Sequence, residues 1–120
     1  MAIDYTIFPE EKLICVKYSG VFNKIDIVNA RKFVSEDKDY NPVFNVIEDV
    51  SAVEEVDANF DELSKLSPES IMQKDIKHCI VAVTELQFAM SRMYQMLAEY
   101  AGHEIHIFKS LEEAKSWISA

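Results

Sequence analysis

The residue types most often used for catalysis or metal binding are sparse in this sequence, which has three histidines and two cysteines among 120 residues. His103 and His106 lie three positions apart in or beside a predicted strand, where alternation turns their side chains to opposite faces. Metal ligands must converge on one point, as two residues on one helical face do. The spacing therefore predicts no metal site.

The two cysteines also lack the surroundings of a nucleophile. Cys15 and Cys79 each lie inside an apolar run, where a free cysteine behaves as a small buried hydrophobe. Neither has a neighbouring base in the sequence to activate it. Gly20 and Gly102 are too far apart to form a phosphate-binding loop. We therefore expect a non-enzymatic protein with no catalytic residue and no cofactor.

Carboxylates cluster after the apolar run 43–50. The cluster comprises Glu48, Asp49, Glu54, Glu55, Asp57, Asp61 and Glu62. If the run is a strand of an open α/β sheet, these side chains line the carboxyl edge of the strands, where such sheets commonly bind ligands. A cation or a basic peptide could bind there. The alternative, which we favour, is a solvated loop whose carboxylates stabilise the start of a helix.

Segment 85–101 predicts a long helix with more apolar surface than one core-facing stripe requires. The stripe expected to face the core comprises Leu86, Met90, Met93, Leu97 and Tyr100. Phe88, Tyr94 and Met96 lie off that stripe. A surface rich in methionine and aromatic residues suits an adaptable partner or an apolar ligand. The alternative is a helix buried on two sides, by the sheet and by the last helix.

The binding surface expected from this pattern comprises Phe88, Arg92, Met93, Tyr94 and Met96. We expect self-association to be its first use, so the sequence predicts a homodimer, and a different protein partner would use the same surface. The alternative function is to carry a small apolar, lipid-like ligand bound under helix 85–101.

The chain opens with a predicted hairpin. Residues 3–8 alternate between apolar and polar types, and 12–19 is rich in β-branched and aromatic residues. The connection 9–11 is so short that the two strands must be antiparallel. Gly20 is expected to end the second strand.

The middle of the chain predicts a helix, a strand and a short helix. Asn23 and Asp26 mark the start of an amphipathic helix over 24–37. The apolar run 43–50 predicts an inner strand, and Asp57 is expected to cap the next helix. That helix carries Phe60, Leu63 and Leu66, and it ends at a break over 67–70.

The last third predicts two further strand–helix units. Segment 78–83 is strongly β-branched and predicts a central parallel strand. Thr84 and Gln87 form a capping-box pattern at the start of the long helix, and Gly102 follows its end. A short strand over 104–108 precedes the final helix. That helix opens at Ser110 and Glu113 and turns Leu111, Ala114, Trp117 and Ile118 inward.

The predicted fold is a single α/β domain over 1–120. The order β-β-α-β-α-β-α-β-α implies a mixed sheet that is parallel after its N-terminal antiparallel hairpin, with four covering helices. The formal net charge of −9 disfavours nucleic acid and membrane surfaces as partners. Met1–Tyr5 lacks the pattern of a signal peptide, and no apolar run approaches the length of a membrane span. We therefore expect a cytoplasmic protein.

The order of the elements and four local segments resemble the SpoIIAA-like fold family, which includes the STAS domains. The segments are Tyr18-Ser19-Gly20, Asp49-Val50-Ser51, Phe88-Ala89-Met90-Ser91-Arg92-Met93-Tyr94-Gln95 and Phe108-Lys109-Ser110-Leu111-Glu112-Glu113-Ala114. The chain looks most like the small stand-alone bacterial proteins described as STAS-like or CRAL-TRIO-like. The resemblance covers nearly the whole chain. It implies a SpoIIAA-like fold and a regulatory interaction role, and its CRAL-TRIO side implies an apolar ligand.

The resemblance also locates a regulatory motif. STAS domains of the anti-sigma-antagonist type carry an Asp-Ser-Ser-Gly-like motif after the third strand, and a kinase phosphorylates its serine. The corresponding segment here is Asp57-Ala58-Asn59-Phe60, in which the Asp matches. Ala58 and Asn59 have no hydroxyl to accept phosphate, so the phosphoswitch is not carried over. Asp57 and Asn59 are kept as candidate partner-binding residues.

Overall fold

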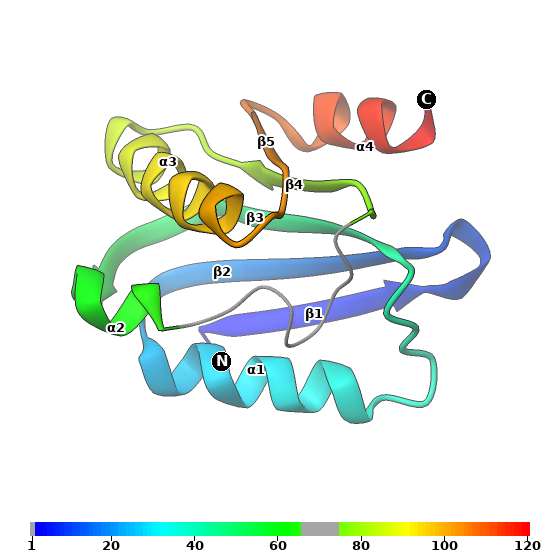
Figure 1. The fold of residues 1–120 in the computed structure, drawn as a ribbon, viewed down its shortest axis with the longest axis horizontal. Helices are drawn as coiled ribbons and strands as arrows, with labels where there is room; N and C mark the ends of the chain where they lie inside the picture. Colours follow the sequence, from blue (N-terminus) through cyan, green and yellow to red (C-terminus); the bar gives the residue numbers. More distant parts are fainter. Residues whose placement is uncertain (1, 66–74) are drawn as a thin grey trace.

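The computed structural model describes residues 2–65 and 75–120, which form a five-stranded sheet with helices on both faces (Figure 1). The strands lie in chain order: β1 (Ile3–Phe8), β2 (Leu13–Asn23), β3 (Asn45–Asp57), β4 (His78–Val81) and β5 (Ile105–Phe108). The helices are α1 (Lys24–Glu36), α2 (Phe60–Ser64), α3 (Glu85–Tyr100) and α4 (Leu111–Ser119). β1 is antiparallel to β2, and the later neighbours are parallel. The predicted mixed sheet with its N-terminal hairpin and four helices is confirmed.

The sheet separates two hydrophobic cores, and Figure 1 shows α1 and α4 on opposite sides of it. The larger core lies against α1 and α3 and contains Ile14, Val46 and Ile80 from three adjacent strands. The smaller core lies against α4 and contains Ile47 and Ala114. Val46 and Ile47 enter different cores because successive side chains of a strand point to opposite faces.

β2 and β3 are longer than predicted. The strand expected over 12–19 continues to Asn23, and the strand expected over 43–50 continues to Asp57. The prediction that Gly20 ends β2 is wrong. Gly20 adopts a φ of 64° inside the strand, next to an irregularity in its pairing with β3. Glycine reaches positive φ at little cost, so the strand bends there and continues to pair.

β4 lies between β3 and β5 and buries all four of its residues, as a strand covered on both faces should. The sequence predicted a central parallel strand here, and β4 is an interior strand with a parallel neighbour on each side, although the middle strand of the five is β3. β3 is harder to recognise because its second half is rich in charged residues.

The helix starts follow the predicted caps, with one correction. Capping boxes form at Asn23 and Thr84, and the Ser110 side chain accepts a hydrogen bond from the backbone N–H of Glu113. The prediction that Asp57 caps the short helix is wrong, because Asp57 is still in β3 and Asn59 caps α2. Leu66 and the predicted break over 67–70 lie outside the described residues.

The buried side chain of Gln87 joins the start of α3 to the second half of β3. Its Nε2 donates to the carbonyl oxygens of Ser51 and Val53, at 3.0 and 2.9 Å. Its Oε1 accepts from the backbone N–H groups of Val83 and Thr84, at 2.9 and 3.1 Å. One amide thus satisfies four backbone groups and fixes α3 over the sheet.

Candidate functional site

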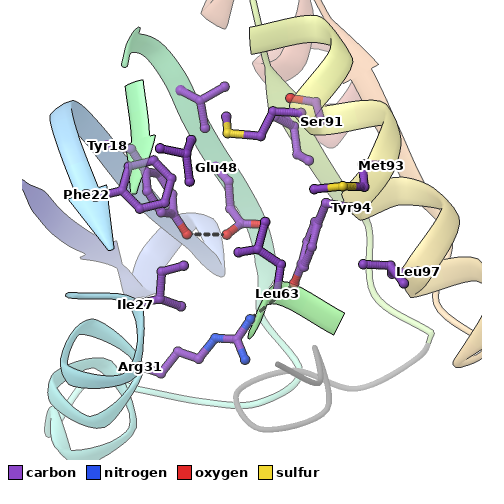
Figure 2. A pocket seen from close by; sticks show the side chains of 14 residues that line it. Tyr18, Phe22, Ile27, Arg31, Glu48, Leu63, Ser91, Met93, Tyr94 and Leu97 are labelled. Atoms are coloured by element: carbon purple, nitrogen blue, oxygen red, sulfur yellow. Dashed lines mark hydrogen bonds between the residues drawn. The ribbon is translucent and has the colours of Figure 1, made fainter. Parts of the chain in front are cut away.

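A cavity of about 70 Å³ lies between the sheet and helices α1, α2 and α3 (Figure 2). Most of its lining is apolar and includes Phe22, Ile27, Val50, Ile80, Met90 and Leu97. Four polar side chains with functional potential also line it: Tyr18 from β2, Arg31 from α1, Glu48 from β3 and Tyr94 from α3. Two strands and two helices thus bring these groups to one cavity.

Glu48 is the centre of a buried hydrogen-bond network. The Tyr18 hydroxyl donates to Glu48 Oε1 at 2.6 Å, and His78 Nε2 lies 2.6 Å from Glu48 Oε2. Glu48 is 8% exposed and His78 is 2% exposed. A buried carboxylate without such partners would be strongly destabilising.

The network holds Glu48 in its ionised form. Burial alone would raise the pKa of Glu48, but the hydrogen bond and charge of His78, together with Tyr18 and Arg31, lower its pKa below the ordinary value. Burial and the adjacent Glu48 carboxylate raise the pKa of Tyr18 well above its ordinary value. Tyr18 therefore remains a neutral hydroxyl that donates to Glu48.

The opposite wall carries a second polar pair. Arg31 Nη2 donates to the Tyr94 hydroxyl at 3.2 Å, and the Tyr94 ring lies edge-on to the His78 ring with centroids 6.5 Å apart. Burial, followed by the charge of Glu48, raises the pKa of Tyr94. Tyr94 is therefore also a neutral phenol, and Figure 2 shows it on the opposite side of the cavity from Tyr18.

Strand alternation explains why this network forms. Glu48 shares its face of β3 with the core residues Val46 and Val50, while Ile47 belongs to the core on the other face. His78 pairs with Val46 in the parallel register of β3 and β4, one step from Glu48 along that face. The placement of Glu48 in a solvated acidic cluster was therefore wrong. The available signal was its place in the alternation, two positions from both Val46 and Val50 on the same face of the strand.

The network has the carboxylate–imidazole pair found in many catalytic sites, but the cysteines lie elsewhere. Cys15 and Cys79 belong to the core against α4, and neither lines the cavity. Burial, followed by the charge of Glu48, raises the pKa of Cys79 to about 12. Ser91 does line the cavity, but within the described residues its buried hydroxyl has no hydrogen-bond partner and so no base. This chemistry suits binding better than nucleophilic attack.

The outward face of α3 is a second candidate surface. The predicted core-facing stripe of this helix is wrong in part, because some of its residues lie on the outward face. Leu86 and Tyr100 were expected to be inward but are 54% and 97% exposed, whereas Gln87, Ser91 and Ala98 are buried. The hydrophobicity pattern misled because two core-facing positions carry polar side chains. A polar side chain can be buried when it forms hydrogen bonds with backbone groups, as Gln87 does.

The predicted binding residues of α3 divide between these two regions. Phe88 and Met96 are 43% and 66% exposed, and the exposed Arg92 donates to Gln95 Oε1 at 3.2 Å. Met93 and Tyr94 are partly buried and line the cavity. The five residues therefore form an exposed set and a cavity-lining set.

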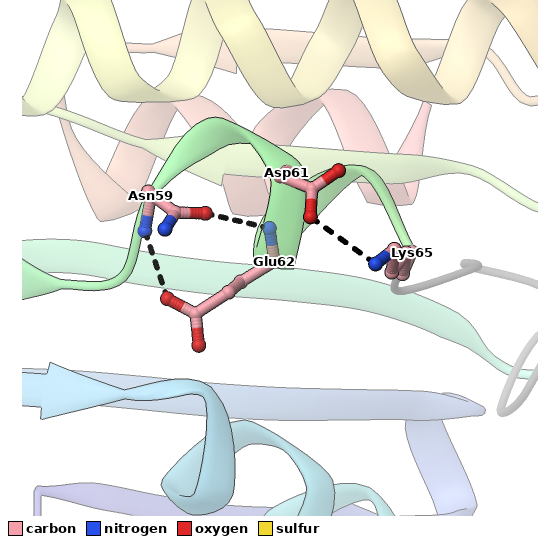
Figure 3. Close-up of polar contacts among 4 residues, drawn as sticks. All are labelled: Asn59, Asp61, Glu62 and Lys65. Atoms are coloured by element: carbon pink, nitrogen blue, oxygen red, sulfur yellow. Dashed lines mark hydrogen bonds and ion pairs between the residues drawn. The ribbon is translucent and has the colours of Figure 1, made fainter.

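Of the remaining predicted residues, Asp57 is the last residue of β3, and Asn59 caps α2 (Figure 3). The Asn59 side chain accepts from the backbone N–H of Glu62, and the Glu62 carboxylate accepts from the backbone N–H of Asn59. Lys65 and Asp61 form an exposed ion pair at 3.1 Å. No group of three or more histidine, cysteine or acidic side chains among residues 2–65 and 75–120 is arranged to hold a metal ion.

The overall architecture is shared with solved structures. Neither a family model nor a curated protein matches the sequence. An uncharacterized DUF3478-family protein with a SpoIIAA-like fold from Shewanella loihica matches with a TM-score of 0.65 and 17% identity, over 98% of this chain and 94% of that protein. The fold is SpoIIAA-like. An anti-sigma factor antagonist from Mycobacterium paratuberculosis matches with a TM-score of 0.57 and 15% identity, over 98% and 95% of the two chains.

The predicted SpoIIAA-like resemblance is thus confirmed at the level of the fold. In this SpoIIAA-like chain, the segment expected to correspond to the phosphorylated motif contains the cap of α2 at Asn59. None of the helices formed by the described residues is both long and apolar enough to span a membrane.

Proposed function

We propose that this chain is a non-enzymatic, STAS-like regulatory interaction module that acts by pairing with a second copy through the outward face of α3. The supporting observation is an exposed apolar stripe on that helix. It comprises the exposed residues Leu86, Ala89, Met96 and Tyr100, together with Met93, which is partly buried and also lines the cavity. Apolar residues that remain exposed together on one helix commonly mark an interaction surface.

The spacing within the stripe favours another helix as the occupant. Its residues follow one another at intervals of three, four, three and four, which is the a/d pattern of a coiled-coil seam. Glu85, Arg92 and Glu99 recur every seven residues beside the stripe, at the flanking g positions. Such positions commonly form ion pairs between helices.

The flanking charges support a second copy as that occupant. The g positions alternate in sign along α3, as negative, positive and negative at Glu85, Arg92 and Glu99. Two antiparallel copies offset by one heptad would bring the Arg92 of each beside the Glu99 of the other, whereas full overlap would place Arg92 against Arg92. With that offset the stripe and its charges are complementary to themselves, which a two-fold interface requires.

The fold neighbours are consistent with an interaction role. One of them is named as an anti-sigma factor antagonist, although its 15% identity carries the fold alone. The lipid-like carrier is less well supported, because the cavity of about 70 Å³ is small. An engineered cavity of about 150 Å³ holds benzene, which is itself smaller than an acyl chain.

The test is the solution mass of the parent protein and of two charge variants. Met96→Glu places a carboxylate in the middle of the stripe, whereas Ile25→Glu makes the same change on α1 at equal exposure, 67% against 66%. We expect the parent and Ile25→Glu to sediment at twice the 13.8 kDa chain mass at micromolar concentration. We expect Met96→Glu to sediment as a monomer.

Two results would count against the proposal. If the parent protein stays monomeric at micromolar concentration, the proposed homodimer is excluded. A dimer lost equally in Met96→Glu and Ile25→Glu would move the interface away from α3. Circular dichroism of each variant separates a lost interface from a lost fold.

A further inference from the structure

We infer that the cavity under α3 is a binding site for a small neutral molecule that carries a hydroxyl group, which Glu48 and Tyr94 recognise together. The inference depends on the interior side of α3, and Met93 is the one residue that it shares with the proposed pairing stripe. Size, charge and hydrogen-bonding capacity each restrict the ligand.

The cavity volume restricts the size of the ligand. The space of about 70 Å³ is roughly half that of the cavity that holds benzene. A molecule of about four non-hydrogen atoms, or the tip of a larger one, fits this space. Its body must be apolar, because side chains such as Phe22, Met90 and Leu97 form most of the lining.

The charges in the wall favour a neutral ligand. Glu48 contributes a buried negative charge, and Arg31 contributes a positive charge on the same cavity. An anion entering the cavity would meet Glu48, and a cation would meet Arg31. A neutral molecule avoids both penalties, which are large inside a protein.

The hydrogen-bonding capacity left in the wall specifies a hydroxyl. Each oxygen of Glu48 accepts one hydrogen bond from the protein and can accept another. The Tyr94 oxygen accepts from Arg31, while the part of the chain that the structure describes offers the Tyr94 hydroxyl proton no acceptor. A ligand hydroxyl would donate to Glu48 and accept from Tyr94. A ketone could accept but not donate.

The test uses four probes of equal size: propan-2-ol, acetone, acetate and isopropylammonium. Binding is followed through the ¹³C-labelled methyl signals of Met90 and Met93, which line the cavity, with the exposed Met96 as an internal reference. We expect propan-2-ol to bind with a dissociation constant in about the millimolar range, given the affinity available to so few atoms. The other three probes should bind at least about tenfold more weakly.

Two variants locate the contact. Tyr94→Phe removes the donating hydroxyl and keeps the ring, so the affinity for propan-2-ol should fall about tenfold. Tyr5→Phe makes the same change at a tyrosine that does not line the cavity, where the hydroxyl donates to Asp37 at 2.9 Å, and it should leave the affinity unchanged.

Several results would overturn the inference. Acetone binding as tightly as propan-2-ol would exclude recognition of the hydroxyl, and tighter binding of acetate or isopropylammonium would exclude a neutral ligand. Absence of any shift at Met90 and Met93, or a shift confined to Met96, would exclude the cavity. Retained affinity in Tyr94→Phe would exclude Tyr94.

Discussion

His78 Nε2 lies 2.6 Å from Glu48 Oε2 in the interior of the protein, so β3 and β4 are joined by side chains as well as by their backbone ladder. The Tyr18 hydroxyl extends this connection to β2 through the other oxygen of Glu48. Three adjacent strands therefore depend on one ionised carboxylate. Loss of either partner would leave that charge poorly compensated inside the protein.

We expect His78→Leu to lower the free energy of unfolding by about 3 kcal/mol, because it leaves Glu48 buried without its main partner. The matched control is His106→Leu. His106 contacts a carboxylate at 2.8 Å as well, but its partner Glu104 is 80% exposed. That change should cost less than about 1 kcal/mol. Urea unfolding of both variants measures the difference, and equal losses would contradict the prediction.

A second change tests the charge itself. If His78→Leu is damaging because Glu48 remains ionised, adding Glu48→Leu should recover part of the lost stability, since apolar replacement of a whole buried pair is often tolerated. If the double variant is no more stable than His78→Leu, the stability lost in His78→Leu comes from removing the imidazole ring itself and not from leaving the carboxylate unpaired.

Glu48 should also make stability depend on pH. Its pKa is lowered in the folded protein relative to the ordinary value of 4.5. Its contribution is therefore complete above that value and is lost as the pH falls through the lower pKa of the folded state. Other carboxylates titrate equally in a Glu48→Gln variant. The difference in Tm between parent and variant should stay constant from about pH 7 to about pH 4.5 and narrow as the pH falls further. A difference that stays constant below about pH 4.5 would contradict the lowered pKa.

We expect Gln87→Leu to lower the free energy of unfolding by about 3 kcal/mol, because it removes the side-chain partner of four backbone groups, all at least partly buried in these bonds. Gln95→Leu is the control on the same helix, since the Gln95 side chain donates to one backbone carbonyl, that of Ile105. Its loss should be about 1 kcal/mol. Urea unfolding measures both losses of stability. Similar losses in the two variants would show that the four hydrogen bonds of Gln87 contribute no more than the single bond of Gln95.

The two cysteines should react at different rates with a thiol reagent. Burial raises the pKa of both thiols, to about 12 for Cys79, which is fully buried, whereas Cys15 is partly exposed. The thiolate is the reactive form, so Cys15 should be alkylated first in the native protein. Mass spectrometry after brief iodoacetamide treatment identifies the site. After unfolding in guanidinium, both cysteines should be modified to a comparable extent. Comparable modification in the native protein would contradict the burial of Cys79.

Much of the fold could be predicted because its signals are local. Thr84 and Gln87 form the expected capping box, and Asn23 caps α1 as expected. The hairpin follows from a connection too short for any other arrangement. The extension of β3 to Asp57 could not be read from periodicity, since it depends on pairing with the second half of β2.

The candidate site was harder to predict because its key contacts join distant parts of the chain. Glu48 and His78 are thirty positions apart and meet through the register of two parallel strands. The same limitation explains the misplaced stripe of α3, where Gln87 and Ser91 face the core in spite of their polar types. Polar side chains buried by partners elsewhere in the fold leave no hydrophobic signal.

The chain-order arrangement of the strands has a consequence for synthesis. Each strand pairs with the strand made just before it, so the sheet can grow as the chain leaves the ribosome, without waiting for a later segment to insert. Pairing between near neighbours also keeps loop-closure costs low at every step. Until β4 emerges, however, the carboxylate of Glu48 has no imidazole to meet, so the nascent three-stranded intermediate should stay loosely packed around that position.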